Sequence, residues 1–382
     1  MKREKGRKVV VLYGGESVEH RVSCRSAATV CAHLHSSGYI PLPIAISRDG
    51  KWSLHPYHKT TEKLTELDSR FVVEQEVMIL PGQGLFLTST MKPVEMDIVF
   101  PMVHGYGGED GKLQGLLEHA HIPYIGCGCS ASANGMHKFT TKLLAKEIGV
   151  PVLPGMVVER RKLETLSGFE DPYIEQLTTE IRERIGETVL VKPEDGGSSI
   201  GITVIQQLKA RTLYEALIRT ARFTRFILVE PWIKAVQELE VAVVTDGSAI
   251  LSSDPGLLVD PMKESQHLVT YEQKYLSSHC AHMQIPAGIP EKRAQTISHY
   301  AISVAKILGV EGYARVDFFY DETTEDIYFN EINTVPGMTG TSHFPLLAQS
   351  MDYGWETLLV LLIREGLDSF ERRRRRELVA VE

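Results

Sequence analysis

The sequence predicts an α/β protein in which an N-terminal open parallel sheet is followed by two further units of helices and strands. Apolar, strand-like segments alternate with helical segments through the first third of the chain, which favours parallel strands joined by crossover helices. At roughly 100–200 residues per domain, 382 residues correspond to about two or three domains. The composition, 43% hydrophobic and 24% charged, is typical of globular proteins. We therefore expect three units, each with a core.

The first unit is predicted over residues 1–126. Its elements are expected as buried strands at 8–13, 39–46 and 97–103 and helices at 22–35 and 113–121. Residues 51–96 contain polar stretches and a Pro-Gly turn, and we interpret them as an elaboration of this unit. Their composition indicates no function.

The second and third units are predicted over residues 127–226 and 227–368. In the second, we expect helices at 138–148, 174–185 and 213–222, an extended segment at 151–158, and strands at 188–192 and 202–205. From residue 226 onward, at the start of the third unit, we expect strands at 226–230, 238–244, 313–320 and 327–332 and helices at 292–308 and 355–365. A long loop, 255–281, is expected to be mobile, and residues 369–382 form a charged tail.

Charge and hydropathy exclude two classes of partner. The formal net charge is −8, and five of the 41 basic residues stand together at 372–376, so a general nucleic-acid surface is not expected. The apolar run 358–363 is far shorter than the ~20 residues of a membrane span. The run 9–13 is shorter than a signal-peptide core of roughly 7–15 residues. Five scattered cysteines fit reduced thiols, so a cytoplasmic protein without membrane or nucleic-acid partners is expected.

The predicted strand ends at Lys192. A glycine–serine loop follows it and extends to Gly201. Small residues let backbone N–H groups approach a phosphate closely, and the lysine adds a positive charge. The lysine precedes the glycines and no Gly-Lys-Ser/Thr follows, so this is not the usual P-loop. From this segment alone, phosphate binding and a flexible surface turn are equal alternatives.

Two adjacent strands carry a cluster of polar residues. Arg315 and Asp317 are two apart on one strand, and Glu331 and Asn333 are two apart on the next, so each pair shares a face. Two carboxylates and an amide oxygen suit Mg²⁺, and the arginine could stabilise charge on a transferring group. The alternative is a surface ladder of salt bridges, but the apolar neighbours indicate a buried sheet, where unpaired carboxylates are costly.

Three further loops lie where ligands commonly bind. Residues 336–343 follow the Glu-x-Asn strand and offer backbone and hydroxyl donors, although a loop before a helix is the alternative. Residues 14–20 follow the first strand, and 104–111 follow another strand. Residues 126–131 match Gly-x-Gly-x-x-Ala, with Glu147 further on, which leaves a dinucleotide oxidoreductase as a distant alternative.

Taken in order, these segments resemble the D-alanine:D-alanine ligase family of ATP-grasp enzymes. The resemblance runs from about Val9 to Glu365 and rests on seven motifs: Gly14-Gly-x-Ser-x-Glu19-His, His104-Gly-x-x-Gly-Glu-Asp-Gly, Met136-x-Lys138, Lys192-Pro with Gly-Ser-Ser-x-Gly201, Tyr271-Glu-x-Lys-Tyr275, Arg315-x-Asp317, and Glu331-x-Asn-Thr-x-Pro-Gly-Met-Thr339. It implies an ATP-grasp fold in which three domains surround one cleft.

The resemblance also implies a role for individual residues. It implies that Lys138 and Lys192 bind the phosphates of ATP and that Ser199 covers the γ-phosphate. The residues implied to surround adenine and ribose are Glu230, Pro231, Trp232, Ile233 and Glu238. For two Mg²⁺ ions, with Mn²⁺ as an alternative, they are Asp317, Glu331 and Asn333. For catalysis and substrate binding, they are Glu19, Ser198 and Tyr275 across the closed site, Arg315 and Gly337 at the oxyanion, and His104, Lys274, Ser342 and His343.

The activity implied is the ATP-dependent joining of two D-alanines through an acyl phosphate, for bacterial peptidoglycan precursors and hence cell-wall synthesis and cell shape. The same chemistry with D-serine or D-lactate as second substrate is the alternative. Tyr275 favours an amine over D-lactate, because relatives that make D-alanyl-D-lactate have histidine there, whereas D-serine and the effect of His343 stay open. A non-catalytic nucleotide-binding protein is a further hypothesis. The resemblance also implies a homodimer.

Overall fold

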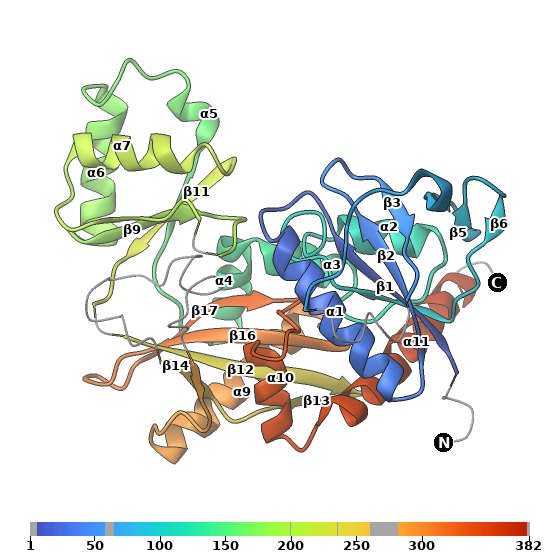
Figure 1. The fold of residues 1–382 in the computed structure, drawn as a ribbon. Coiled ribbons are helices and arrows are strands. Elements are labelled where there is room, and N and C mark those ends of the chain that lie inside the picture. The colour runs from blue at the N-terminus through green and yellow to red at the C-terminus, as the bar shows by residue number, and fades with distance from the viewer. Residues whose placement is uncertain (1–5, 58–64, 199, 235, 260–281, 380–382) are drawn as a thin grey trace.

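The computed structural model describes residues 6–57, 65–198, 200–234, 236–259 and 282–379 (Figure 1). Within this part of the chain, the strands form four sheets. The N-terminal sheet lies on one side of the molecule, the central sheet rises on the other, and the C-terminal sheet lies below and between them (Figure 1). The predicted α/β class is confirmed.

The N-terminal sheet has the strand order β3-β2-β1-β7. Its strands are β1 (Lys8–Gly14), β2 (Ile40–Ile46), β3 (Trp52–Leu54) and β7 (Ile98–Pro101). The strand β1 pairs in parallel with both β2 and β7, as the sequence predicted. Alternate residues of β1 enter two different cores, with Val9 and Val11 in one and Val10 and Leu12 in the other. Both faces of β1 are therefore covered, which explains its uninterrupted apolar sequence.

Helices α1 (His20–Ser36) and α2 (Lys112–His119) belong to this unit. The turn into α1 begins at Gly14, whose φ is +94°. A Cβ atom there would lie 2.2 Å from the carbonyl oxygen of Ile46, so only glycine fits. This close approach places the loop with Glu19 at the carboxyl end of β1.

The predicted elaboration forms a small sheet of β4 (Val77–Leu80), β5 (Gly84–Leu87) and β6 (Lys92–Pro93), preceded by the short helix η2 (Val73–Gln75). The segment before η2 packs on α1, where the Leu67 N–H donates to the carbonyl of Cys24 and Arg21 pairs with Glu66. Ser69 Oγ lies 2.7 Å from Nε2 of His20. The elaboration thus supports the helix that begins just after Glu19.

The central sheet is antiparallel, in the order β10-β9-β11-β8. Its strands are β8 (Met156–Glu159), β9 (Val189–Pro193), β10 (Thr203–Ile205) and β11 (Phe226–Pro231), and its helices are α5 (Arg160–Leu163), α6 (Pro172–Arg184) and α7 (Ala210–Thr220). We expected the strand at 226–230 to open the third unit, but it pairs with β8 and β9. A strand's own sequence does not specify its neighbour.

The C-terminal sheet has the order β15-β14-β12-β16-β17, with β13 also paired to β12. Its strands are β12 (Gln237–Asp246), β13 (Ala249–Ser252), β14 (Gly256–Val259), β15 (His282–Gln284), β16 (Tyr313–Tyr320) and β17 (Ile327–Asn333). The strand β14 corrects the first part of the expected loop 255–281; residues 260–281 lie outside the described residues.

Three helices pack on this sheet: α3 (Cys129–Met136), α4 (Lys138–Glu147) and α9 (Glu291–Leu308). Helix α3 was not predicted. Gly128 precedes its first turn, so the glycine pattern at 126–131 is a helix start that packs near β17. Because α3 and α4 share a core with β12 and β16, residues 127–150 pack with the C-terminal sheet although they precede the central one.

The chain ends in α10 (His343–Ser350) and α11 (Trp355–Val379). Residues of both helices share a core with β1 and α1, so they tie the C-terminal unit to the N-terminal one. Helix α11 continues beyond the predicted end at 365, and the tail is helical as far as 379. Arg372 pairs with buried Glu365 at 2.6 Å, and Arg373 pairs with Glu311. No helix in the described ranges has the length and apolar character needed to cross a bilayer.

Candidate active site

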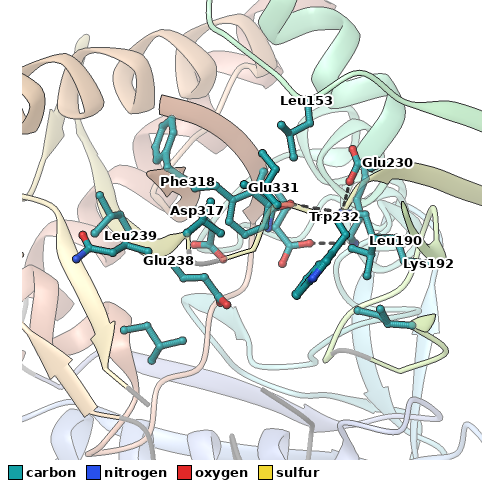
Figure 2. A pocket seen from close by; sticks show the side chains of 18 of the residues that line it. Leu153, Leu190, Lys192, Glu230, Trp232, Glu238, Leu239, Asp317, Phe318 and Glu331 are labelled. Atoms are coloured by element: carbon teal, nitrogen blue, oxygen red, sulfur yellow. Dashed lines mark hydrogen bonds and ion pairs between the residues drawn. The ribbon is translucent and has the colours of Figure 1, made fainter. Parts of the chain in front are cut away.

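A pocket of about 530 Å³ lies between the central and C-terminal sheets. In Figure 2, Trp232, Leu190 and Lys192 line one side, Leu239 and Glu238 the other, and Asp317 and Glu331 lie between them. The lining includes seven of the eight residues that sequence assigned to the nucleotide: Lys138, Lys192, Glu230, Pro231, Trp232, Ile233 and Glu238. The eighth, Ser199, lies outside the described residues. Both apolar surface and lysines therefore face one space.

A buried cluster of charges forms the floor of this pocket. The carboxylate of Glu230 is 1% exposed and lies between two lysines, Lys192 at 2.6 Å and Lys142. Burial alone would raise the pKa of Glu230, but the two lysines outweigh it and hold that pKa below its usual value. Burial lowers the pKa of Lys142 to about 8, against the opposing effect of Glu230. Glu230 thus fixes the ammonium group of Lys192 at the pocket.

Lys142 was not singled out from sequence, although it lies one helical turn after Lys138 on α4. We expect Lys142→Met to lower the free energy of unfolding by about 3 kcal/mol, because removing one partner of a buried ion pair leaves the other under-compensated. Urea unfolding measures this. Lys146→Met, on the same helix but exposed, is the matched control and should change stability little. Equal stability of the two variants would contradict the assignment of Lys142.

Lys138 is the first residue of α4 and links the pocket to the glycine–serine loop. Its Nζ lies 3.1 Å from Glu331 and donates to the carbonyl oxygen of Gly196. Burial lowers the pKa of Lys138, but Glu331 and neighbouring carboxylates outweigh that effect and raise it. Glu194, also missed from sequence, accepts from the Phe139 N–H at 3.0 Å at the start of α4. The loop after β9 and the start of α4 are therefore fastened together.

The polar cluster on β16 and β17 is assembled as the spacing predicted. Arg315 donates to both oxygens of Asp317 at 2.8 and 2.7 Å, and Asn333 Nδ2 donates to Asp317 at 3.0 Å. Arg315 Nε also lies 3.0 Å from Glu240, which faces Asp317 across the β12–β16 ladder. Burial raises the pKa of Asp317 to about 7, assisted by Glu240 and Glu331 and opposed by Arg315.

These residues fit a divalent cation. Asp317, Glu331 and Asn333 present hard oxygen atoms, and a cation would offset the negative charges of Glu240 and Glu331, which add to the effect of burial in raising the pKa of Asp317. Within the described ranges, no group of three or more His, Cys, Asp or Glu side chains could hold a metal. A cation at this place would therefore take further ligands from a bound phosphate or water, as Mg²⁺ normally does.

A second, smaller cavity of about 70 Å³ adjoins the first. It is lined by loops and strand ends of the N-terminal and C-terminal units, including Glu19, His104, Glu109, Arg315, Asn333 and Gly337. Lys138, Gly196, Gly197, Ser198 and Glu331 line both spaces. Ser198 Oγ donates to Glu19 across the cavity. Residues far apart in sequence thus meet where the two cavities join.

Two family models cover nearly the whole chain. The one described as "D-ala D-ala ligase N-terminus" matches residues 8–127, and "D-ala D-ala ligase C-terminus" matches residues 144–364, more than half of the chain. The chain belongs to the D-alanine–D-alanine ligase family. The identification from ordered motifs is confirmed.

Relatives of this ligase family align along nearly the whole of this chain. The D-alanine–D-alanine ligase of Acetivibrio thermocellus is 33% identical over 372 residues, 94% of this chain and 95% of the relative. The solved D-alanine–D-alanine ligase of Coxiella burnetii has a TM-score of 0.79 at 26% identity and covers 98% of this chain and 100% of its own. The VanG D-Ala:D-Ser ligase of Enterococcus faecalis has a TM-score of 0.77 at 27% identity, covering 95% and 100%. The ATP-grasp fold is confirmed.

The remaining ligase-family positions are placed as follows. His104 is 3% exposed and both ring nitrogens contact protein groups, Nδ1 the carbonyl oxygen of Val335 and Nε2 the hydroxyl of Ser26. Ser342 Oγ accepts from the Thr339 N–H at 2.9 Å beside Gly337. His343 Nδ1 lies 2.9 Å from Glu240. Lys274 and Tyr275 lie outside the described residues. Substrate roles for these five residues stay predictions.

Glu109 was part of a motif but received no role from sequence. Burial, with a contribution from Glu19, raises the pKa of Glu109 from 4.5 to about 8, although backbone N–H groups of Gly105 and Val335 and the charge of Arg315 oppose the rise. Between these two values the folded protein holds a proton that the unfolded chain has released. The stability from this group is thus present at low pH and lost as pH rises through about 8.

We expect Glu109→Gln, which does not titrate, to reduce this pH dependence. Urea unfolding of both proteins at about pH 5.5 and about pH 8.5 gives the slope of the free energy of unfolding against pH. The wild-type free energy should fall more steeply over this range than that of the variant. The comparison uses the slopes, because the substitution also changes hydrogen bonds at every pH. Equal slopes of the free energy of unfolding against pH in the two proteins would show that the pKa of Glu109 is not raised.

Proposed function

We propose that this protein joins two D-alanine molecules at the expense of ATP. The observation that carries the proposal is the junction of the two cavities at Lys138, Ser198 and Glu331. A nucleotide in the larger cavity would have its terminal phosphate beside the smaller cavity, where Glu19 and Arg315 suit amino-acid substrates. The relatives named as D-alanine–D-alanine ligases support this substrate over the alternatives.

In the larger cavity, the apolar side chains would receive the base and the lysines the phosphates. Asp317, Glu331 and Asn333 would hold two Mg²⁺ ions, or Mn²⁺, which when bound would offset the negative charge of the phosphates. Lys138 and Lys192 add fixed positive charge at the same place. Ser199 is proposed to cover the γ-phosphate, from its position in the motif.

In the smaller cavity, the carboxylate of Glu19 would pair with the ammonium group of the first D-alanine. The carboxylate of that alanine takes the γ-phosphoryl group, which leaves ADP and an acyl phosphate, a far better electrophile than a carboxylate. The second D-alanine, once its amine has lost a proton, attacks the carbonyl carbon, and inorganic phosphate leaves. Arg315 and the Gly337 N–H would stabilise the oxyanion formed on the way.

D-serine is the alternative second substrate, because the VanG D-Ala:D-Ser ligase is a structural neighbour. The sequence Tyr271–Tyr275 favours an amine acceptor, so D-lactate is not favoured. With D-alanine in both positions, the product would serve peptidoglycan precursor synthesis. We further propose a cytoplasmic location and a homodimer, both from the family.

The test is phosphate release from ATP and Mg²⁺ with D-alanine, compared with L-alanine. Release only with the D-enantiomer is expected, and equal release with both would contradict the proposal. A mixture of D-alanine, D-serine and D-lactate, analysed by mass spectrometry, identifies the acceptor. A mainly D-alanyl-D-serine product would replace the proposed second substrate while keeping the chemistry.

A further inference from the structure

The loop that follows β17, residues 334–339, is held by side chains of the N-terminal unit. Val335 is contacted at both ends of its backbone: its N–H donates to Glu109 Oε1 at 2.8 Å, and its carbonyl oxygen lies 2.8 Å from His104 Nδ1. Three residues on, the Met338 N–H donates to Ser26 Oγ at 3.1 Å. Hydrogen bonds from another unit therefore hold this loop on both sides of Gly337.

The same side chains hold one another in place. Glu109 Oε2 accepts from the Gly105 N–H at 2.7 Å, so one carboxyl group bonds both the His104 loop and Val335. Ser26 Oγ lies 2.9 Å from His104 Nε2. Because Nδ1 faces a carbonyl oxygen, it must donate, and neutral His104 then accepts from the Ser26 hydroxyl. Burial lowers the pKa of His104 and so favours this neutral form.

Val335 and Met338 are the two residues held by these hydrogen bonds. Of the two residues between them, Pro336 restricts the backbone, whereas Gly337 has no side chain to do so. Gly337 lines the small cavity, and a Cβ atom added to it would lie 2.9 Å from Ser342 Oγ. Oxyanion donors accelerate a reaction only when they already point at the developing charge, and a donor of this kind contributes on the order of 10²–10³ in kcat. The position of Gly337 thus matters more than its chemistry, since any residue except proline has the N–H.

We propose that Glu109 and His104 act as a clamp on Val335 that positions the Gly337 N–H for the reaction. They are positioning residues rather than catalytic ones, and the inference rests on the proposed ligase function. The clamp joins the unit that carries Glu19 to the loop that carries Gly337. Ser17 extends the connection, because its hydroxyl donates to the His104 carbonyl at 2.7 Å and accepts from the Glu19 N–H at 3.1 Å.

Glu109→Gln tests the clamp. A carboxyl group can accept through both oxygens in either protonation state, whereas an amide accepts through one and turns an NH₂ toward the other backbone N–H. We expect kcat to fall by about 100-fold, as for loss of one aligned oxyanion donor, with ADP affinity unchanged because the larger cavity is not altered. The matched control is Asp110→Asn in the same loop, whose carboxylate, within the described part of the chain, accepts hydrogen bonds from Gly107 and Lys112 of its own loop. It should retain wild-type kcat within about twofold.

Hydrogen–deuterium exchange provides a readout that needs no turnover. In the wild-type protein, the amides of residues 334–339 should be protected, and Glu109→Gln should speed their exchange by about tenfold while Asp110→Asn leaves it unchanged. Fast exchange with lost kcat and intact ADP binding supports the clamp. Unchanged exchange, or loss of ADP binding together with kcat, overturns it. If the wild type does not use D-alanine, the proposed function fails, and exchange still decides whether Glu109 holds the loop.

Discussion

Replacing Arg315 by lysine is expected to lower kcat by about 100- to 1,000-fold, the effect of losing one aligned donor to an oxyanion. The guanidinium group bonds both oxygens of Asp317 and lies 3.0 Å from Glu240, so it is held between a partly buried carboxylate and a buried one. Lysine keeps the charge but cannot reproduce that planar, two-pronged geometry. The measurement is steady-state kcat with saturating ATP and D-alanine, together with a titration of ADP binding, which should stay close to wild type.

The matched control for this variant is Arg293→Lys. Arg293 pairs with Glu325 at 3.0 Å on the surface of the same unit, where a lysine serves nearly as well. Its kcat should remain within about twofold of wild type. An Arg315→Lys enzyme with a kcat as high as this control would remove the arginine from the proposed mechanism.

Replacing Glu331 by glutamine is expected to lower kcat by on the order of 100-fold or more, since a correctly placed divalent cation supplies several kcal/mol of charge stabilisation. Glu331 lines both cavities and lies 3.1 Å from Lys138, so the substitution removes a negative charge at their junction. The Mg²⁺ concentration that gives half-maximal rate should rise. Mn²⁺ binding in the presence of ADP, followed by electron paramagnetic resonance, should weaken in parallel.

Glu322→Gln is the control for the metal prediction. Glu322 is exposed, lies between β16 and β17, and accepts a hydrogen bond from Gln237 Nε2 at 2.7 Å. This variant should bind Mn²⁺ and turn over as the wild type does. Tight Mn²⁺ binding by Glu331→Gln would reject Glu331 as a ligand, whatever its kcat.

The strands and helices near the site were predictable because their residues carry strong local patterns. Residues 313–320 were expected as a strand and form β16 with these limits, since alternation of buried apolar residues with less buried ones is typical of a strand. The spacing of Arg315 and Asp317 likewise predicted a shared face, because side chains alternate along any strand. Helix α3 was missed because its glycine and small residues give a weak helical signal.

Contacts between distant segments could not be derived in this way. Lys142 and Glu230 are 88 residues apart, and Glu109 and Val335 are 226 apart, yet each pair is bonded. Nothing in the local sequence of Glu109 specifies a partner, since an acidic residue in a glycine-rich loop is also typical of a solvated turn. The pairing of β11 with β9 could not be predicted either, because the sequence of a strand does not specify its partner.

The sequence by itself determined many of the strands and helices, the family and the residue types at the site, because local backbone preferences and ordered motifs are properties of short segments. The tertiary structure alone decided which charges are compensated: Glu230 by Lys142 and Lys192, and Asp317 by Arg315. The physical reason is that a buried charge is tolerated only when a partner lies within a few ångströms. That distance is set by how sheets from three parts of the chain pack, not by neighbours in sequence.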